Sequence, residues 1–162
     1  MVNFKINGSQ VSAMEGETIW QVAKRYEISI PHLCHADEVG YDPDGNCRAC
    51  VVQIDNERAL AASCIRKPKE GMDVSSVKPE VKETQKIIFE LLAADQPDIE
   101  IHPDPESKFW NWCDKLGVDN KAFPKNKVVK KDISHPSMHV NLEACINCNL
   151  CVRACREVQS ND

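Results

Sequence analysis

The sequence has no run of about 18 consecutive apolar residues, the length that a membrane span requires. It also has no N-terminal segment that joins a basic start to an apolar stretch, the pattern of an export signal. Positive charge is scarce, because 20 Lys and Arg stand against 25 Asp and Glu and leave a net charge of −5. We therefore expect a cytoplasmic protein without a membrane span. Nucleic acid is disfavoured as a partner, since phosphates attract clustered Lys and Arg.

Signals of enzyme chemistry are scarce as well. No Gly-rich loop of the kind that cradles phosphates occurs. The five histidines are scattered and none has a partnered nucleophile, so we interpret each as a surface or packing residue. They are His32, His35, His102, His135 and His139. We expect neither a catalytic site nor a small-molecule substrate site in these residues.

Cysteine is the residue in excess, with nine in 162 residues. The remaining composition, 42% hydrophobic and 28% charged, is ordinary for a globular protein. An odd number of cysteines without an export signal argues against disulfides and for metal binding in a reducing compartment.

Residues 1–78 predict a small α+β domain. Asn7-Gly8 is typical of a two-residue hairpin turn between strands at Val2–Ile6 and Gln10–Met14. A helix capped by Thr18 is expected over residues 19–26. Further strands are expected at Val51–Ile54, Arg58–Ser63 and Met72–Val77. A hairpin, a helix and further strands in this order indicate a β-grasp fold.

Three segments follow the predicted β-grasp domain. Residues 79–119 form a helical connector, with one helix starting at Pro79 and a short one over Glu106–Leu116. Residues 120–139 are interpreted as a linker, whose Lys-rich run at 125–131 is a solvated stretch rather than a polyanion site. Residues 140–162 are a module of their own.

A first cysteine cluster lies in the predicted β-grasp domain. Intervals of 12, 2 and 13 residues separate its members, Cys34, Cys47, Cys50 and Cys64. Four thiolates are what a [2Fe–2S] centre needs, and the loop glycines Gly40 and Gly45 let backbone N–H groups approach the bridging sulfides. The spacing is a variant of the plant-type ferredoxin pattern. Structural zinc is the alternative, although zinc sites usually pair two tight Cys-x2-Cys units and only one is present.

A second cluster lies in the tail. Cys145, Cys148, Cys151 and Cys155 follow intervals of 2, 2 and 3 residues, the run that holds [4Fe–4S] clusters in bacterial ferredoxins. In two-cluster ferredoxins the fourth Cys ligates the other cluster, but no second run occurs in these residues. We expect the run to start a helix at Cys155. We favour a truncated chain; otherwise Cys155 or an unpaired Cys completes the site.

These residues carry a family resemblance. Residues 31–35 (PHLCH) and 46–52 (NCRACVV) resemble the ligand loop of the N-terminal [2Fe–2S] domain in the large iron–sulfur subunit of respiratory NADH dehydrogenase. NAD-linked hydrogenases and NAD-dependent formate dehydrogenases share that domain. Residues 144–159 resemble most the formate dehydrogenase alpha subunits.

The sequence departs from that family between the two clusters. The family usually places a His and three Cys there, as an unusual [4Fe–4S] site. His102 resembles its opening, but Glu106, Phe109 and Lys115 stand where thiolates are needed. We therefore expect this middle cluster to be absent. We interpret Cys113, which is alone in the region, as a buried structural thiol.

The resemblance implies an electron-transfer protein or fragment with [2Fe–2S] and [4Fe–4S] cofactors. It would relay single electrons within a NAD-linked oxidoreductase complex, most closely a formate dehydrogenase, beside a flavoprotein and a catalytic subunit. One alternative is the small diaphorase-type iron–sulfur subunit of a NAD-linked hydrogenase. Another is a zinc-stabilised interaction module without a redox role.

Several charged or polar residues flank the predicted ligands. His32 and His35 are candidates to tune the first cluster through hydrogen bonds. Arg153 and Arg156 are candidates to offset the charge of the tail cluster, but solvated surface is the default interpretation of both.

Overall fold

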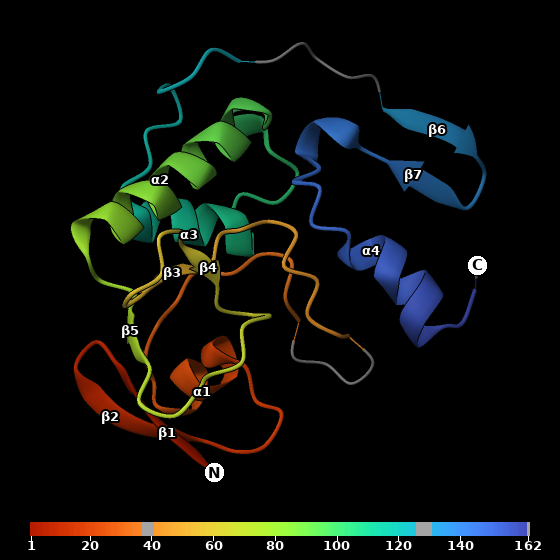
Figure 1. Ribbon diagram of the computed structural model, residues 1–162. Coiled ribbons are helices and arrows are strands. Elements are labelled where there is room, and N and C mark those ends of the chain that lie inside the picture. The colour runs from red at the N-terminus through yellow and green to blue at the C-terminus, as the bar shows by residue number, and fades with distance from the viewer. Residues whose placement is uncertain (37–40, 126–130, 162) are drawn as a thin grey trace. The chain divides into compact units, whose positions relative to one another are not determined.

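The computed structural model describes residues 1–36, 41–125 and 131–161 (Figure 1). The chain divides into two compact units, Met1–Gln85 with Asn149–Asp162, and Lys86–Cys148. Helix α2, Pro79–Ala94, runs across the boundary between them. Among the described residues, no helix is both long and apolar enough to cross a membrane.

A five-stranded sheet forms the frame of the first unit. Its strands are β1 (Val2–Ile6), β2 (Ser9–Ala13), β3 (Val51–Ile54), β4 (Ala61–Ala62) and β5 (Asp73–Ser75). The spatial order is β2-β1-β5-β3-β4, in which β1 and β5 are parallel and the other neighbours antiparallel. Asn7 and Gly8 form the β1–β2 turn with φ of 52° and 81°, the conformation of a type I′ hairpin. The predicted β-grasp fold is confirmed.

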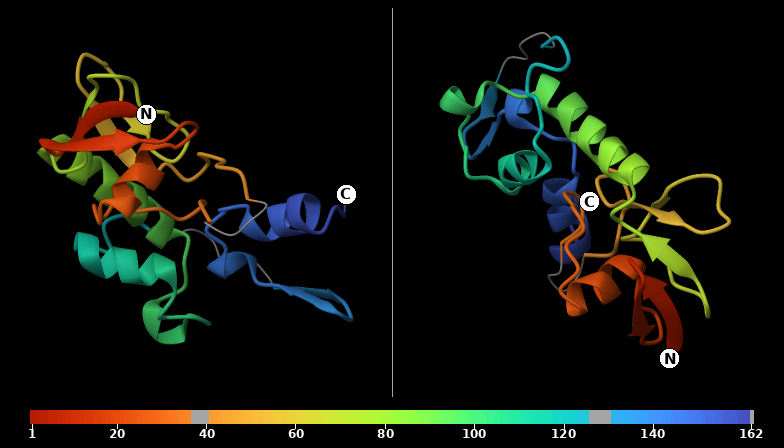
Figure 2. Two further views of the ribbon diagram at one scale, coloured as in Figure 1. Left: turned by 90° about the horizontal axis from the view of Figure 1, so that it is seen from below. Right: turned by 90° about the vertical axis from the view of Figure 1, so that its left-hand side faces the viewer.

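Helix α1, Ile19–Arg25, covers one side of the β1–β2 hairpin (Figure 2). It begins with a capping box: the Thr18 hydroxyl accepts the Gln21 N–H at 3.3 Å, and the Gln21 side-chain oxygen accepts the Thr18 N–H at 2.8 Å. Its apolar face packs with Phe4, Ile6 and Val74 of the sheet in one core. The first unit thereby holds α1 firmly, which matters because the N-terminus of α1 contacts the cysteine segments.

The second unit is built around α2 and α3, Lys108–Leu116. Phe89 of α2 stacks on Phe109 of α3 with ring centroids 5.8 Å apart, and both side chains are buried. Gly117 ends α3 in the left-handed conformation, at φ 61°. The remaining elements of this unit are η1 (Ile99–Ile101), β6 (Asp132–His135), β7 (Met138–Val140) and η2 (Leu142–Ala144).

Some elements differ from the sequence-based expectation. The strand expected over residues 58–63 shrinks to Ala61–Ala62. The short helix begins at Lys108 rather than Glu106, because Ser107 is its N-cap and accepts the Trp110 N–H at 3.4 Å. An exposed β6–β7 hairpin lies in the segment predicted as a linker, whereas residues 126–130 of the Lys-rich run lie outside the described residues. The boundaries at 78, 119 and 139 stay predictions.

The tail returns to the first unit as α4, Leu150–Arg153, continued by a π-type turn, η3, over Ala154–Val158. The expectation of a helix starting at Cys155 is wrong, because the helix begins at Leu150. Asn149 caps it at φ 64°, a left-handed conformation that Asn adopts more readily than most residues.

Candidate metal centre

The pairing of β3 with β4 brings two of the predicted ligands together. Val51 pairs with Ala62, and one step outward the Ser63 N–H donates to the Cys50 carbonyl at 3.2 Å. The Ser63 hydroxyl donates to the same carbonyl at 2.7 Å. Since Cys64 follows Ser63, the end of this ladder fixes the backbones of both cysteines.

Helix α1 holds the segments that carry Cys64 and Cys34. The backbone N–H groups of Ile19 and Trp20, in its first turn, donate to the carbonyls of Arg66 and Ser63 at 2.8 and 3.0 Å. The Trp20 indole N–H donates to the Ile30 carbonyl at 3.3 Å, four residues before Cys34. The free N–H groups of a helix start thus become anchors for the site.

Cys34 and Cys47 face each other across the ligand loop. The Cys34 N–H approaches the Cys47 sulfur at 3.5 Å, and the Cys47 N–H approaches the Cys34 sulfur at 3.4 Å. The loop makes this possible with left-handed backbone at Gly45 and Arg48, where φ is 66° and 58°. A Cβ at Gly45 would lie 2.9 Å from Ile65 Cδ1, so both conformation and space favour glycine there. Gly40 lies outside the described residues.

The four thiols form one connected set. Side-chain hydrogen bonds from Cys47 and Cys64 lower the pKa of Cys34, and one from Cys64 lowers the pKa of Cys50. The pKa values of the partner thiols are raised instead. The hydrogen bond with Cys34 raises the pKa of Cys47, and those with Cys34 and Cys50 raise the pKa of Cys64. Cys34, Cys50 and Cys64 are at most 2% exposed. The residues predicted for the first cluster therefore do come together.

The contacts join the thiols as two pairs, Cys34 with Cys47 and Cys50 with Cys64, and Cys34 also contacts Cys64. Within the part of the chain that the structure describes, no three His, Cys, Asp or Glu side chains are placed so that they could hold one metal ion together. Two pairs of thiols are the donor set for two irons, and the N–H groups of Asn46 and Cys47 hydrogen-bond the Cys34 sulfur in support. The residues present fit a [2Fe–2S] centre.

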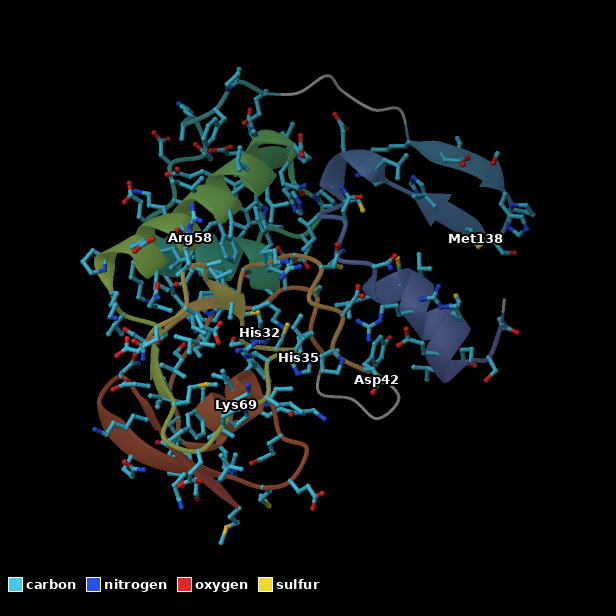
Figure 3. All side chains as sticks on the ribbon, in the orientation of Figure 1. His32, His35, Asp42, Arg58, Lys69 and Met138 are labelled. Carbon is cyan, nitrogen blue, oxygen red and sulfur yellow. The ribbon has the colours of Figure 1, made fainter. Side chains whose placement is uncertain are left out.

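An aromatic cluster flanks Cys34. The Trp20 ring lies 4.4 Å from the His32 ring and 4.5 Å from the His35 ring, centroid to centroid, both edge-on. His35 is 3% exposed, and Figure 3 shows it beside His32. Both histidines pack against Trp20, the second of the two roles expected for them (surface or packing), and their tuning of the first cluster stays a prediction.

The tail cysteines belong to both units. Cys145 and Cys148 lie in the second unit, and Cys151 and Cys155 lie in the first, where both are exposed. The Asn147 N–H approaches the Cys145 sulfur at 3.4 Å, and Asn147 takes a left-handed φ of 52°. Backbone N–H groups aimed at sulfur suit a thiolate cluster. The [4Fe–4S] site itself stays a prediction from the cysteine spacing.

Arg153 lies beside the first cysteine cluster, a contact that the sequence-based interpretation did not predict. Its side chain is 2% exposed, so the expected solvated surface is wrong for Arg153. The expectation holds for Arg156, which is 54% exposed. Arg153 forms an ion pair with Glu157 at 3.1 Å and donates to the carbonyls of Cys34 and Asp42. Nothing local in the sequence signals this burial, because both carbonyls lie more than a hundred positions away.

Among the residues that the structure describes, no set of thiols surrounds His102. The His102 Nδ1 accepts the Asp104 N–H at 3.0 Å, and its Nε2 lies 3.4 Å from the Gln96 side-chain oxygen. Since that oxygen only accepts, Nε2 carries the proton, and protein groups occupy both ring nitrogens. Phe109 is buried and stacked where a thiolate would be needed.

Cys113 is buried and lies apart from these clusters. It is 5% exposed, and burial raises the pKa of its thiol to about 12. The expected burial of Cys113 is confirmed, and its structural role stays a prediction.

Comparison with known proteins agrees with this geometry. Residues 1–79 match the protein family described as "2Fe-2S iron-sulfur cluster binding domain". A similar curated protein is "Probable oxidoreductase YjgC" of Bacillus subtilis (strain 168), 30% identical over 166 residues, which cover 95% of this chain and 16% of that protein. A NADH-quinone oxidoreductase subunit of Rickettsia felis is 27% identical over 161 residues, or 98% of this chain and 24% of that protein.

Two further relatives extend the comparison. The formate dehydrogenase-like protein YrhE of Bacillus subtilis (strain 168) is 24% identical over 168 residues, 99% of this chain and 17% of that protein. The crystal structure of a NAD+-reducing [NiFe]-hydrogenase in the H2-reduced state superposes with a TM-score of 0.79 and 27% identity, covering 95% of this chain and 65% of that chain. The chain thus spans less than a quarter of each of these curated relatives and about two thirds of the hydrogenase chain.

Proposed function

We propose that Cys34, Cys47, Cys50 and Cys64 are the ligands of a [2Fe–2S] centre, since residues 1–79 match the family of 2Fe-2S iron–sulfur cluster binding domains. The observation that carries the assignment is the connected set of four thiols in two pairs. When bound, such a centre takes up and releases one electron at a time.

The residues around the thiols have definite tasks in this proposal. The β3–β4 ladder and the α1 N-terminus hold the backbones of Cys50 and Cys64 in place. The N–H groups of Asn46 and Cys47 hydrogen-bond sulfur, which favours the more negative, reduced state of the centre. Burial of three of the four cysteines keeps water from the sulfurs.

The tail run is proposed to hold a [4Fe–4S] centre through Cys145, Cys148, Cys151 and Cys155. Its support is the spacing of 2, 2 and 3 residues together with the Asn147 N–H aimed at the Cys145 sulfur. The left-handed Asn147 and Asn149 let the chain curl between successive cysteines, as wrapping around a cluster requires.

We assign to the chain the relay of single electrons inside a NAD-linked oxidoreductase, beside a flavoprotein and a catalytic subunit. The likeness to YrhE and the tail sequence favour a formate dehydrogenase-like complex. A NAD-linked hydrogenase is the second candidate, favoured by the hydrogenase structure of which this chain covers 65%.

Serine substitutions test the ligand assignment. In anaerobically reconstituted full chain, Cys64→Ser removes one of the paired thiols and should abolish the slow-relaxing [2Fe–2S] EPR signal after dithionite reduction. Cys148→Ser should remove only the fast-relaxing [4Fe–4S] signal. Cys113→Ser is the matched control, because Cys113 lies outside both sets, and it should keep both signals. An unchanged [2Fe–2S] signal in Cys64→Ser would overturn the assignment, and zinc in place of iron would favour the interaction module.

A further inference from the structure

Arg153 stands out because it is a fully charged side chain buried almost completely, at 2% exposed. A charge is buried at a high cost unless hydrogen bonds and an opposite charge compensate it. It lies between Cys151 and Cys155 of the tail, within the first unit. Its burial therefore indicates a specific task rather than a solvated side chain beside a cluster.

The guanidinium uses its donors on two segments. Nε and Nη2 bind the Glu157 carboxylate on the same turn of the tail at 3.1 to 3.2 Å. Nη1 donates to the Cys34 carbonyl at 3.3 Å, and Nη2 also donates to the Asp42 carbonyl. The Tyr41 ring lies beneath the cation, 5.4 Å away. Figure 3 shows Asp42 beside α4.

The two carbonyls belong to the ligand loop, one on Cys34 itself and one between Cys34 and Cys47. A planar guanidinium can hold two carbonyls and a carboxylate in one fixed arrangement, whereas a Lys ammonium cannot. The same contacts place a buried positive charge against the backbone of Cys34. Because a buried charge is screened less than an exposed one, it acts on a nearby thiolate centre more strongly than Arg156 does.

We infer that Arg153 is a positioning residue for the [2Fe–2S] centre: it fastens the backbone carbonyls of Cys34 and Asp42 to the tail helix, and its charge stabilises the reduced centre. The inference rests on the proposed function. It assigns to the tail a second role, which is to set the midpoint potential of the centre at the other end of the sequence. Glu157 opposes this effect, because its carboxylate partly neutralises the cation.

Three variants of the full chain, loaded anaerobically, test the inference by EPR-monitored redox titration of the [2Fe–2S] signal. Arg153→Gln should shift the midpoint potential to a more negative value, because the reduced centre loses a nearby cation. Glu157→Gln should shift it to a more positive value, because the cation is no longer neutralised. Arg156→Gln, which removes an exposed charge three residues further on, is the control and should leave the potential in place. A merely structural role of Arg153 would not produce shifts of opposite sign.

Arg153→Lys separates charge from geometry. It keeps the cation but loses the planar fork, so its potential should lie closer to that of the wild type than the potential of Arg153→Gln does. If the Arg153→Gln chain does not take up the [2Fe–2S] centre, the midpoint potential of Glu157→Gln tests the inference instead, because that variant keeps Arg153. An unchanged potential in Glu157→Gln, or in a loaded Arg153→Gln, would overturn the inference. A wild-type chain without the [2Fe–2S] signal would instead refute the proposed function.

Discussion

At the residue scale, burial without a thiol partner separates Cys113 from the cysteines proposed as ligands. Hydrogen bonds between thiols are the largest cause of the pKa shifts of the four proposed ligands, lowering the pKa of Cys34 and Cys50 and raising that of Cys47 and Cys64, whereas burial is the largest cause of the raised pKa of Cys113. The thiolate is the reactive form of cysteine, so a high pKa makes a thiol inert. Cys113 therefore packs the second unit as a small apolar side chain.

This difference predicts slow alkylation of Cys113 in the folded chain. A pKa raised from 9.0 to about 12 lowers the thiolate fraction at pH 8 roughly a thousandfold. Iodoacetamide at pH 8, followed by peptide mass spectrometry, should leave Cys113 unlabelled when folded and labelled after unfolding in urea. The folded-state rate should increase as the pH rises toward 12, since deprotonation then sets in. Equal labelling of folded and unfolded chain at pH 8 would show that Cys113 is accessible and ionised.

The sequence alone was enough to group Cys34, Cys47, Cys50 and Cys64, which the structure brings together, but not to find the buried contacts of Arg153 beside them. Cysteine spacing is a chemical constraint that remains visible in the sequence, so Cys34, Cys47, Cys50 and Cys64 were identified before any contact was known. Arg153 was interpreted as solvated, because its burial depends on two carbonyls that are remote in sequence. Such a contact leaves no periodicity or motif behind.

At the element scale, α1 is the part of the fold that connects stability to the site. Its capping box provides hydrogen-bond acceptors for the N–H groups of Thr18 and Gln21. The N–H groups of the two residues between them bind the segment around Cys64. Loss of the cap should therefore weaken both the helix and the cysteine arrangement.

We predict that Thr18→Ala lowers the free energy of unfolding by about 1 kcal/mol, because the Gln21 N–H loses its hydroxyl acceptor. Urea denaturation of the apo chain, followed by circular dichroism, measures the change. The matched control is Thr84→Ala in α2, whose hydroxyl only donates back to the Glu80 carbonyl within the helix. That control should be neutral or slightly stabilising, since Ala has the higher helix propensity. Equal decreases in the free energy of unfolding of both variants would show that the Thr18 cap does not stabilise α1 more than an ordinary helix position does.

Turns, caps and strands that a local sequence pattern marks were found where they were predicted. Elements without such a pattern were not predicted correctly. Asn7-Gly8, the Thr18 cap and the strand Val51–Ile54 all appeared where the sequence placed them. The β6–β7 hairpin was missed, because every one of its residues is exposed and no apolar alternation marks its strands. The helix start at Leu150 was missed too, because it depends on a left-handed Asn149 rather than on an apolar pattern.

At the scale of the whole molecule, the residues around His102 decide how many redox centres we predict. His102 has both ring nitrogens bound by protein groups, and the buried Phe109 lies between the rings of Phe89 and Trp110, each of which it contacts. These rings lie in the region where the family resemblance seen in the sequence would imply a third cluster. The chain should therefore carry two centres, one in the β-grasp domain and one in the tail.

The most direct test of this account is the iron and acid-labile sulfide content of anaerobically purified chain, with low-temperature EPR after dithionite reduction. One [2Fe–2S] and one [4Fe–4S] centre together predict about six irons and six sulfides per chain, with one slow-relaxing and one fast-relaxing signal. About two irons with the slow-relaxing signal alone would refute the tail centre and keep the first. Zinc without iron would contradict the central claim that Cys34, Cys47, Cys50 and Cys64 hold an electron-transfer centre.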